Sequence, residues 1–239
     1  MLITTQAIVI SALNYSEADL IVKCFTKSSG LKSYLLRNIL KSKKGKLRTS
    51  MFQPLMQLEI EANHKDKGTL ESIREAKVAY QYQNLHTDIT KTAVVFFISD
   101  MLRNTIIEEE ENTLLFDYLK TAIIWLDTHD TIANFHLLFL VKLTQYLGFY
   151  PDETQQHYEY FNLIEGTFEP SEVNLYCQTG VKINILKQLL GIKFDELPEI
   201  KLNQKQRGDF LTMLLQYYEL HLHGFKKPRS LAVLNSIFT

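Results

Sequence analysis

The strongest constraint on the fold of this chain is a single change in its hydrophobic period near residue 80. Over residues 3–78 apolar side chains recur at every second position, as in strands, whereas beyond Tyr80 they recur at the wider spacing of helices. The sequence therefore predicts two domains, a β domain at 1–80 and a helical domain at 81–239. The fold class is α+β, because the strands precede the helices instead of alternating with them.

Five short strands are expected in the first domain. The clearest is 56–63, where polar and apolar residues alternate without error. Its buried face is expected to hold Met56, Leu58, Ile60 and Ala62. The other expected strands are 3–13, 20–26, 31–37 and 69–78. Five strands in so short a stretch leave no room for crossover helices, so they fit a small antiparallel barrel.

Capping residues and apolar spacing predict five helices in the second domain. Asp88, Asn112 and Asp130 are the expected N-caps of the first three, and Gly148 ends the third. The expected spans are 88–104, 112–126, 130–147, 181–190 and 203–224. The irregular stretch 149–180 has room for only a small hairpin at 158–168, and so long a loop is usually functional or separately stabilised.

Positive charge is concentrated in the first domain. Residues 1–80 hold 13 Lys and Arg against 7 Asp and Glu, a net +6, whereas residues 81–239 hold 13 against 20, a net −7. The densest cluster is Lys41-Ser42-Lys43-Lys44-Gly45-Lys46-Leu47-Arg48, with five cations and no carboxylate. A basic loop on a small sheet predicts a polyanion-binding surface, and a merely hydrated loop is the plainer alternative.

Other patterns in the sequence narrow the class of protein. The apolar runs fall far short of the roughly 20 residues that span a bilayer. The first lysine is Lys23, so the N-terminus lacks the basic region of a secretory signal. Cys24 and Cys177 make no disulfide framework. We therefore expect a soluble protein of the cytoplasm without a membrane partner.

Two polar clusters contain residue types that can bind a catalytic metal, but their spacing does not allow it. The four glutamates at 108–111 precede the expected cap at Asn112, where a helix dipole favours negative charge, and four consecutive residues cannot all converge on one metal ion. His221 and His223, near Glu219, lie two positions apart and face different sides of a helix. No Walker-type loop, nucleophile elbow or dinucleotide fingerprint occurs. The sequence thus predicts no catalytic centre, no metal and no cofactor.

A series of short motifs runs along nearly the whole chain. The most specific is Ala7-Ile8-Val9-Ile10 followed by Asn14-Tyr15-Ser16-Glu17-Ala18-Asp19-Leu20-Ile21-Val22. Later ones are Phe52-Gln53-Pro54-Leu55, Gly68-Thr69-Leu70, Tyr217-Tyr218-Glu219-Leu220 and Lys226-Lys227-Pro228-Arg229-Ser230-Leu231. In this order and spacing they resemble the RecO family of bacterial DNA repair and recombination mediators.

The resemblance implies an OB-fold barrel at 1–80, an all-α domain after it, and a protein that is not an enzyme. Such proteins bind single-stranded and duplex DNA and anneal complementary strands in the cytoplasm, in association with the nucleoid. They work with RecR, and in some lineages RecF, to load RecA on DNA covered by single-strand binding protein. Many carry a four-cysteine zinc site after the third helix. Residues 151–180 hold only Cys177, so we expect no zinc and a loop 149–180 that is held by its own packing.

The expected DNA contacts lie on two turns of the barrel. Tyr34, beside Arg37, is the expected stacking residue, whereas Phe25 and Phe52 are expected in the core. The expected cationic contacts are Arg37, Lys41, Lys43, Lys44, Lys46, Arg48, Lys65 and Lys67. If the five cations of residues 41–48 and one or two neighbours neutralise about 5 phosphates, log affinity for a single strand should fall with log salt at a slope of roughly −3.5.

Several alternatives remain open at this point. Lys226, Lys227 and Arg229 would either extend the DNA track or complement the negative end of the last helix. The acidic tail of single-strand binding protein is expected to bind the second domain, at a place the sequence does not reveal. A metal-dependent nuclease that captures its substrate with the OB-fold and an RNA-binding OB protein are the alternative functions, and EDTA and an RNA pair in an annealing assay would separate them.

Overall fold

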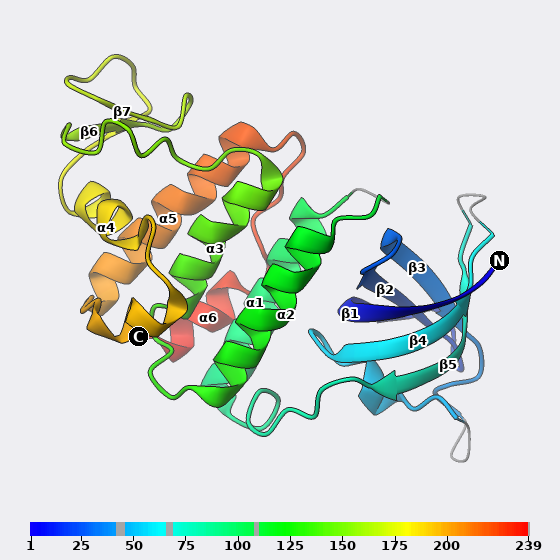
Figure 1. The fold of residues 1–239 in the computed structure, drawn as a ribbon. Helices are drawn as coiled ribbons and strands as arrows, with labels where there is room; N and C mark the ends of the chain where they lie inside the picture. The colour runs from blue at the N-terminus through cyan, green and yellow to red at the C-terminus, as the bar shows by residue number, and fades with distance from the viewer. Residues whose placement is uncertain (42–45, 66–68, 108–109, 239) are drawn as a thin grey trace. The chain divides into compact units, whose positions relative to one another are not determined.

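The structure is a computed structural model that describes residues 1–41, 46–65, 69–107 and 110–238 (Figure 1). The chain forms two compact units, Met1–Thr128 and His129–Thr239. Within the described residues, the first unit contains a five-stranded sheet and two long helices. The second contains the remaining helices and a small three-stranded sheet.

The five strands of the first unit are all antiparallel to their neighbours and follow the order β3-β2-β1-β4-β5. They are β1 (Leu2–Asn14), β2 (Leu20–Thr26), β3 (Gly30–Leu36), β4 (Gln57–Asn63) and β5 (Ser72–Val78). The predicted five-stranded antiparallel fold at the N-terminus is confirmed. Alternation and turn residues are local signals, so each limit lies within three residues of its predicted position.

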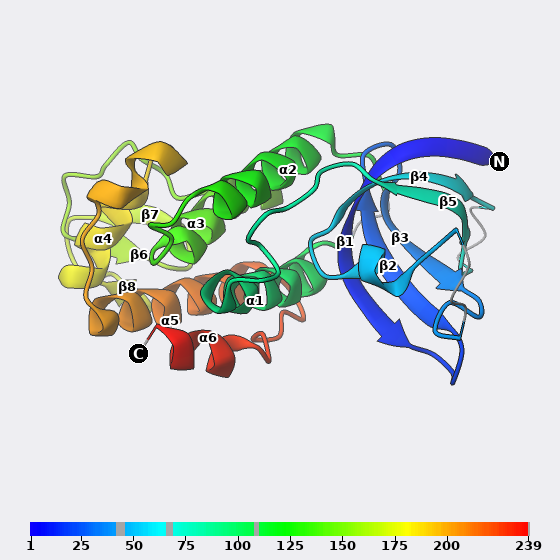
Figure 2. The ribbon, with the colours of Figure 1, turned by 90° about the horizontal axis from the view of Figure 1, so that it is seen from below.

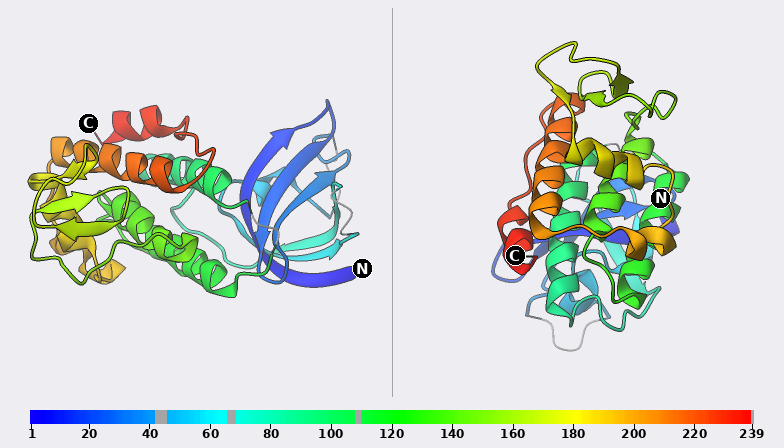
Figure 3. Two further views of the ribbon diagram at one scale, coloured as in Figure 1. Left: turned by 90° about the horizontal axis from the view of Figure 1, so that it is seen from above. Right: turned by 90° about the vertical axis from the view of Figure 1, so that its left-hand side faces the viewer.

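Strong curvature gives this sheet an OB-like form. The first half of β1 pairs with β4 and the second half with β2, and a bulge between Val9 and Ser11 bends the strand where the partners change. An isolated parallel bridge joins Tyr34 of β3 to Glu71, just before β5. There the Glu71 backbone N–H donates to the Ser33 carbonyl at 2.8 Å. Among the described residues, the edge strands thus meet at one bridge, and the sheet curls without a continuous closing ladder (Figure 3, left).

The core of the first unit has two layers, and β1 contributes to both. Ala7 and Val9 face the barrel interior, whereas Ile8 and Ile10, on the opposite face, are also fully buried. The hydroxyl of Ser99, on α1, donates to the Ile10 carbonyl at 2.6 Å. The predicted buried face of the fourth strand is confirmed. Its four side chains are almost fully buried, one just before β4 and three on it: Met56, Leu58, Ile60 and Ala62.

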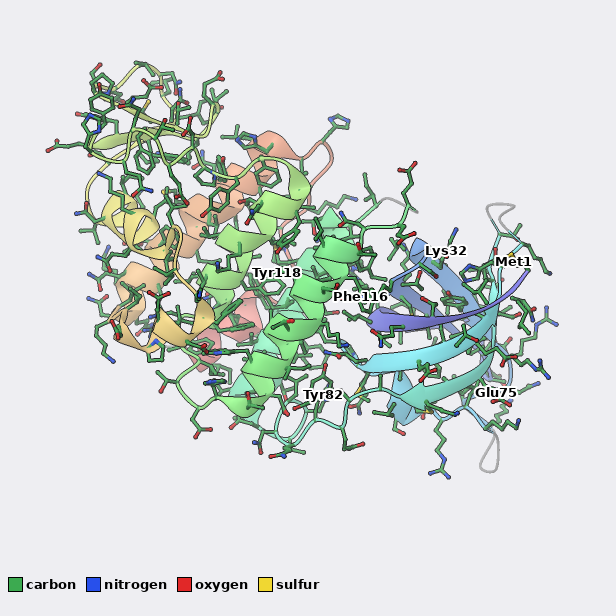
Figure 4. The ribbon with its side chains drawn as sticks, in the orientation of Figure 1. Met1, Lys32, Glu75, Tyr82, Phe116 and Tyr118 are labelled. Carbon is green, nitrogen blue, oxygen red and sulfur yellow. The ribbon has the colours of Figure 1, made fainter. Side chains whose placement is uncertain are left out.

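Two capped helices, α1 (Ile89–Thr105) and α2 (Thr113–Thr128), complete this unit. Asp88 accepts a hydrogen bond from the Lys91 N–H at 2.9 Å, and Asn112 accepts one from the Leu115 N–H at 2.9 Å, so both predicted N-caps are confirmed. Phe116 of α2 lies on the side of the helix that faces the strands (Figure 4), with its ring centroid 6.2 Å from that of Phe25.

A buried carboxylate fixes the link between the sheet and these helices. Asp127, near the end of α2, is fully buried and accepts hydrogen bonds from the backbone N–H groups of Gln83, Asn84 and Leu85. The ammonium group of Lys91, itself buried, donates to the Asp127 carbonyl at 2.7 Å. A carboxylate with several N–H donors is well satisfied in a low-dielectric interior, so the link is held firmly on α2.

The second unit is built on α3 (Phe135–Leu147), α4 (Val181–Leu189), α5 (Gln204–His221) and α6 (Leu231–Ile237), with a 3-10 helix at Phe194–Glu199. The predicted start of the third helix at Asp130 is wrong, because residues 130–135 form tight turns and the helix begins at Phe135. Its predicted end is confirmed, since Gly148 adopts a left-handed conformation with φ of 84°. The seven-residue α6 was not predicted.

The irregular stretch 149–180 packs around a small sheet of order β7-β6-β8 (Figure 2). Its strands are β6 (Tyr160–Asn162), β7 (Thr167–Glu169) and β8 (Cys177–Gln178). The predicted hairpin at 158–168 is confirmed. Phe161, Leu163 and Phe168 are buried beneath it, so this loop carries its own apolar core. Among the described residues, no helix is both long and apolar enough to cross a membrane.

Candidate nucleic-acid interface

The turn after β1 and the segment after β3 lie at the same end of the barrel. Asn14, Leu20 and Leu36 form the last paired row across β1, β2 and β3, and the chain leaves the sheet immediately beyond it. We call the turn 15–19 together with the segment 37–48 the basic rim. Of this segment, residues 42–45 lie outside the described residues, so the predicted contacts Lys43 and Lys44 are not placed.

Backbone hydrogen bonds hold the two parts of the basic rim together. The carboxylate of Asp19 accepts from the Asn38 N–H at 2.8 Å, and the Ala18 carbonyl accepts from the Leu40 N–H at 3.0 Å. Asn38 has a φ of 58°, a left-handed conformation that asparagine tolerates better than most residues. Within the turn, the Ser16 hydroxyl accepts from the Asp19 N–H at 3.1 Å. The turn 15–19 and residues 37–41 therefore have a defined backbone, on which the Arg37 and Lys41 side chains are exposed.

The described cations of the basic rim are exposed, and two of them pair with carboxylates. Lys41 Nζ lies 3.2 Å from Glu17 Oε2, and the Lys46 ammonium donates to Glu75 on β5. The Lys41 and Lys46 side chains stay 62% and 78% exposed. Exposed ion pairs contribute only about 0–1 kcal/mol, so a phosphate can replace either carboxylate at little cost.

The contact with Lys46 also changes the pKa of Glu75. The hydrogen bond from Lys46, together with its positive charge, lowers the pKa of Glu75. Glu75 points outward from β5 (Figure 4). Arg37 and Arg48 are exposed and form no ion pair with another residue in the part of the chain that the structure describes.

Lys65, on the turn between β4 and β5, is exposed above an anchored backbone. Its N–H donates to both carboxylate oxygens of Glu71 at 3.0 Å, and Glu71 is buried at the bridge that joins the edge strands. The Lys65 side chain is exposed, and its own backbone N–H is held by Glu71. Lys67, the other predicted cation of this turn, lies outside the described residues.

The predicted stacking role of Tyr34 is wrong. Tyr34 pairs with Val22 in the β2–β3 ladder, which points its ring into the barrel core, and none of its surface is exposed. Its hydroxyl lies 2.8 Å from His64 Nε2, and burial raises the pKa of Tyr34 above its usual range. A ring inside the barrel cannot stack on a base. Phe25 and Phe52 are in the core, as predicted.

The cations after α5 lie in the second unit. Lys226, Lys227 and Arg229 are all exposed, and Lys227 Nζ lies 3.6 Å from the Glu219 carboxylate. This side-chain contact is directed at a charged residue of α5, not at the carbonyls of its last turn. The two proposed roles of these cations, DNA contact and complement to the helix end, both stay predictions.

His221, from one of the clusters that suggested catalysis, has a structural role. His221 stacks on Phe149, with ring centroids 5.0 Å apart, and its Nε2 lies 2.9 Å from the Leu163 carbonyl. Burial raises the pKa of the Cys24 thiol to about 12, so it is a poor nucleophile. Among the described residues, no group of three His, Cys, Asp or Glu side chains is placed to bind a metal. Glu108 and Glu109 lie outside them.

Comparison with known proteins identifies the family. A family model described as "Recombination protein O N terminal" matches residues 1–82, and a model described as "Recombination protein O C terminal" matches residues 86–231. The chain belongs to the RecO family. Proteins named DNA repair protein RecO from Christiangramia forsetii, Flavobacterium psychrophilum and Bacteroides fragilis are 56%, 48% and 35% identical to it, and each match covers 100% of both chains.

The predicted RecO family is therefore confirmed, and its most specific motif has a clear place in the structure. Residues 7–22 form the curved part of β1, the turn of the basic rim and the start of β2. The two RecO family models meet between residues 82 and 86, in the link that Asp127 holds. Tyr15, which sequence reasoning did not select, is the aromatic residue exposed on this rim, and its position in a polar turn was the available signal.

Proposed function

We propose that this RecO family chain is a DNA-binding recombination mediator in DNA repair. It binds single-stranded and duplex DNA and anneals complementary strands. With RecR, it helps to load RecA on DNA covered by single-strand binding protein. RecF takes part in this step in some lineages of the family. It acts without catalysing a reaction, in the cytoplasm and in association with the nucleoid. The names of its relatives, which are DNA repair proteins, support the repair role.

One observation carries the DNA-binding part of this proposal: exposed cations are gathered on a braced rim of an OB-like barrel. Arg37, Lys41, Lys46 and Arg48 lie within twelve residues of the chain, and the backbone beneath the first two is fixed by Asp19 and the turn 15–19. Neutralising phosphates releases counterions, which supplies sequence-independent affinity for any nucleic-acid strand.

Annealing follows from the kind of contact that this rim offers. Lysine and arginine side chains on an open surface contact phosphates and fix a strand without reading its bases. Two complementary strands that are held in this way repel each other less, while their base edges stay free to pair. The rim also exchanges partners easily, because its ion pairs with Glu17 and Glu75 are exposed and weak.

An annealing assay with charge variants tests this proposal. Labelled complementary DNA strands are mixed with the full-length protein in the presence of EDTA, and annealing without cleavage is expected. Replacing Lys43, Lys44 and Lys46 with Ala should reduce both binding and annealing. The matched control replaces three exposed lysines of the second unit, Lys193, Lys201 and Lys205, and should anneal as the wild type does.

Each other outcome of this assay favours a different function. Cleavage that EDTA abolishes would indicate a metal-dependent nuclease, and annealing of an RNA pair in preference to DNA would indicate an RNA-binding protein. Unchanged annealing by the triple variant would contradict the role of the rim. The mediator step is tested separately by titrating RecR into RecA loading on DNA covered by single-strand binding protein, where loading should require both RecR and this chain.

A further inference from the structure

Tyr15 is the aromatic side chain that the barrel leaves exposed at the basic rim. Its side chain is 63% exposed, whereas Phe25, Tyr34 and Phe52 are at most 1% exposed. Tyr82 donates its hydroxyl to the Leu55 carbonyl and packs edge-on against Tyr80. A side chain this exposed buries little apolar surface, so core packing does not explain the aromatic residue in this turn.

Hydrogen bonds hold the backbone that carries the exposed Tyr15 ring. The Tyr15 N–H donates to the Asp19 carbonyl at 3.0 Å, and Ser16 caps the same turn. Asp19 in turn holds Asn38. The Tyr15 ring makes no contact with another ring and no side-chain hydrogen bond among the described residues of the barrel. It is therefore a flat apolar surface on a preorganised support.

Cations flank this ring on the same edge of the sheet. Tyr15 follows the last paired residue of β1, and Arg37 follows the last paired residue of β3, with β2 between them. Two strand spacings separate these positions by about 10 Å. Lys41 extends from the neighbouring segment to Glu17 of the same turn. Leu13, near the end of β1, and Leu40, whose N–H is bonded to the Ala18 carbonyl, are 57% and 38% exposed at the same end of the sheet.

From this arrangement we infer that Tyr15 is a stacking platform for one unpaired base of single-stranded DNA, whose flanking phosphates contact Arg37 and Lys41. The inference rests on the proposed DNA-binding function and replaces Tyr34 with Tyr15 as the stacking residue. Stacking on a tyrosine ring tolerates every base, because every base has a π-face. It also favours single strands over duplex, because paired bases are already stacked on their neighbours.

The test compares Tyr15→Ala and Tyr15→Phe in the full-length protein by fluorescence anisotropy with a labelled oligothymidine. Removing the ring should weaken single-strand binding by about 5-fold to 150-fold, the effect of losing one stacked base, whereas Phe should bind as tightly as Tyr. Duplex affinity and the salt slope should not change, because no phosphate contact is lost. Tyr176→Ala, an exposed tyrosine in the second unit, is the matched control and should bind as the wild type does.

An abasic oligonucleotide with the same phosphates sharpens this test. The wild type should bind it more weakly than oligothymidine, while Tyr15→Ala should bind both equally, since the ring and the base act through one contact. Equal losses on single strands and duplex, or equal losses for Ala and Phe, would overturn the inference. If the wild type binds DNA with the expected salt slope and Tyr15→Ala changes nothing, only this inference fails. If the wild type binds no DNA, the proposed function fails with it.

Discussion

The basic rim and the stretch 149–180 are both irregular in structure, but they are stabilised in opposite ways. The rim is held by hydrogen bonds between backbone groups and short polar side chains, such as Asp19 to Asn38, and its long side chains point to solvent. The stretch 149–180 is held by buried rings, such as Phe161 and Phe168, whose centroids lie 5.0 Å apart. The first arrangement exposes charged side chains that a ligand can contact, whereas the second mainly stabilises its own fold.

Hydrogen bonds among its own residues also hold the stretch 149–180. Asn162 Oδ1 accepts hydrogen bonds from the Ile164 N–H and from Asn174 Nδ2, each at 3.1 Å. The ammonium group of Lys187 on α4 donates to the Tyr158 carbonyl at 2.7 Å and lies over the Phe168 ring. These contacts join the small sheet to itself and to α4.

The largest expected effect comes from removing a ring of the self-supporting stretch. Phe161→Ala should lower the free energy of unfolding by about 3–5 kcal/mol, because it leaves a cavity under β6. DNA affinity of the folded protein should stay at the wild-type level. Chemical denaturation measures the stability, and anisotropy measures the DNA affinity. A loss of DNA affinity without a loss of stability would contradict the view that the stretch 149–180 stabilises its own fold and the rim binds DNA.

A buried histidine should make the second unit sensitive to acid. Burial, and to a smaller extent the positive charge of Arg207, together lower the pKa of His136 on α3 to about 3. The unfolded chain binds this proton near pH 6.5, so stability is complete above that pH and falls between pH 6.5 and 3, by up to about 1.4 kcal/mol per pH unit. His136→Phe should flatten this dependence in denaturation curves at pH 7, 6 and 5. An equally steep curve for the variant would contradict the assignment.

A pair of glycines tests how tightly the small sheet packs on α5. At Gly166, with a φ of 71°, an added Cβ would lie 2.6 Å from the Tyr217 hydroxyl, whereas at Gly148, with a φ of 84°, nothing lies within 4 Å. Both alanine variants carry backbone strain of about 1–2 kcal/mol, and only Gly166→Ala adds a clash. Thermal denaturation should show the larger loss for Gly166→Ala, and equal losses would indicate that Tyr217 moves freely.

The smallest expected effect is a gain of DNA affinity at the rim. Glu17→Gln and Glu75→Gln remove the carboxylates that pair with Lys41 and Lys46, which frees both cations for phosphates. Each should tighten single-strand binding by about twofold to fivefold at low salt, with stability within about 0.5 kcal/mol of the wild type. Glu59→Gln, an exposed carboxylate on β4, removes the same charge and is the control. Equal gains for all three would indicate a general effect of net charge.

These two regions also differ in how far the sequence could predict them. Strand limits and the caps at Asp88 and Asn112 were predictable, because alternation and capping depend on neighbours in the chain. The inward direction of Tyr34 depends on its pairing with Val22 across the sheet, which a short run beside Arg37 does not encode. The two-residue strand β8 is too short to produce a period at all.

Within the candidate site, the position of the basic cluster could be predicted but its contacts could not. The pair between Lys46 and Glu75 joins residues 29 positions apart, so only the folded barrel brings them together. Tyr15 was visible as an aromatic residue in a polar turn, and its exposure follows from the turn that Asp19 closes.

The salt dependence of single-strand binding tests the central claim most directly, because it counts the phosphates that the basic rim neutralises. For the wild type, log affinity against log salt should have a slope of roughly −3.5, and replacing Lys43, Lys44 and Lys46 with Ala should reduce it to about −1.4. A wild-type slope near zero, or the same slope in both proteins, would contradict the account that cations on the barrel hold the DNA.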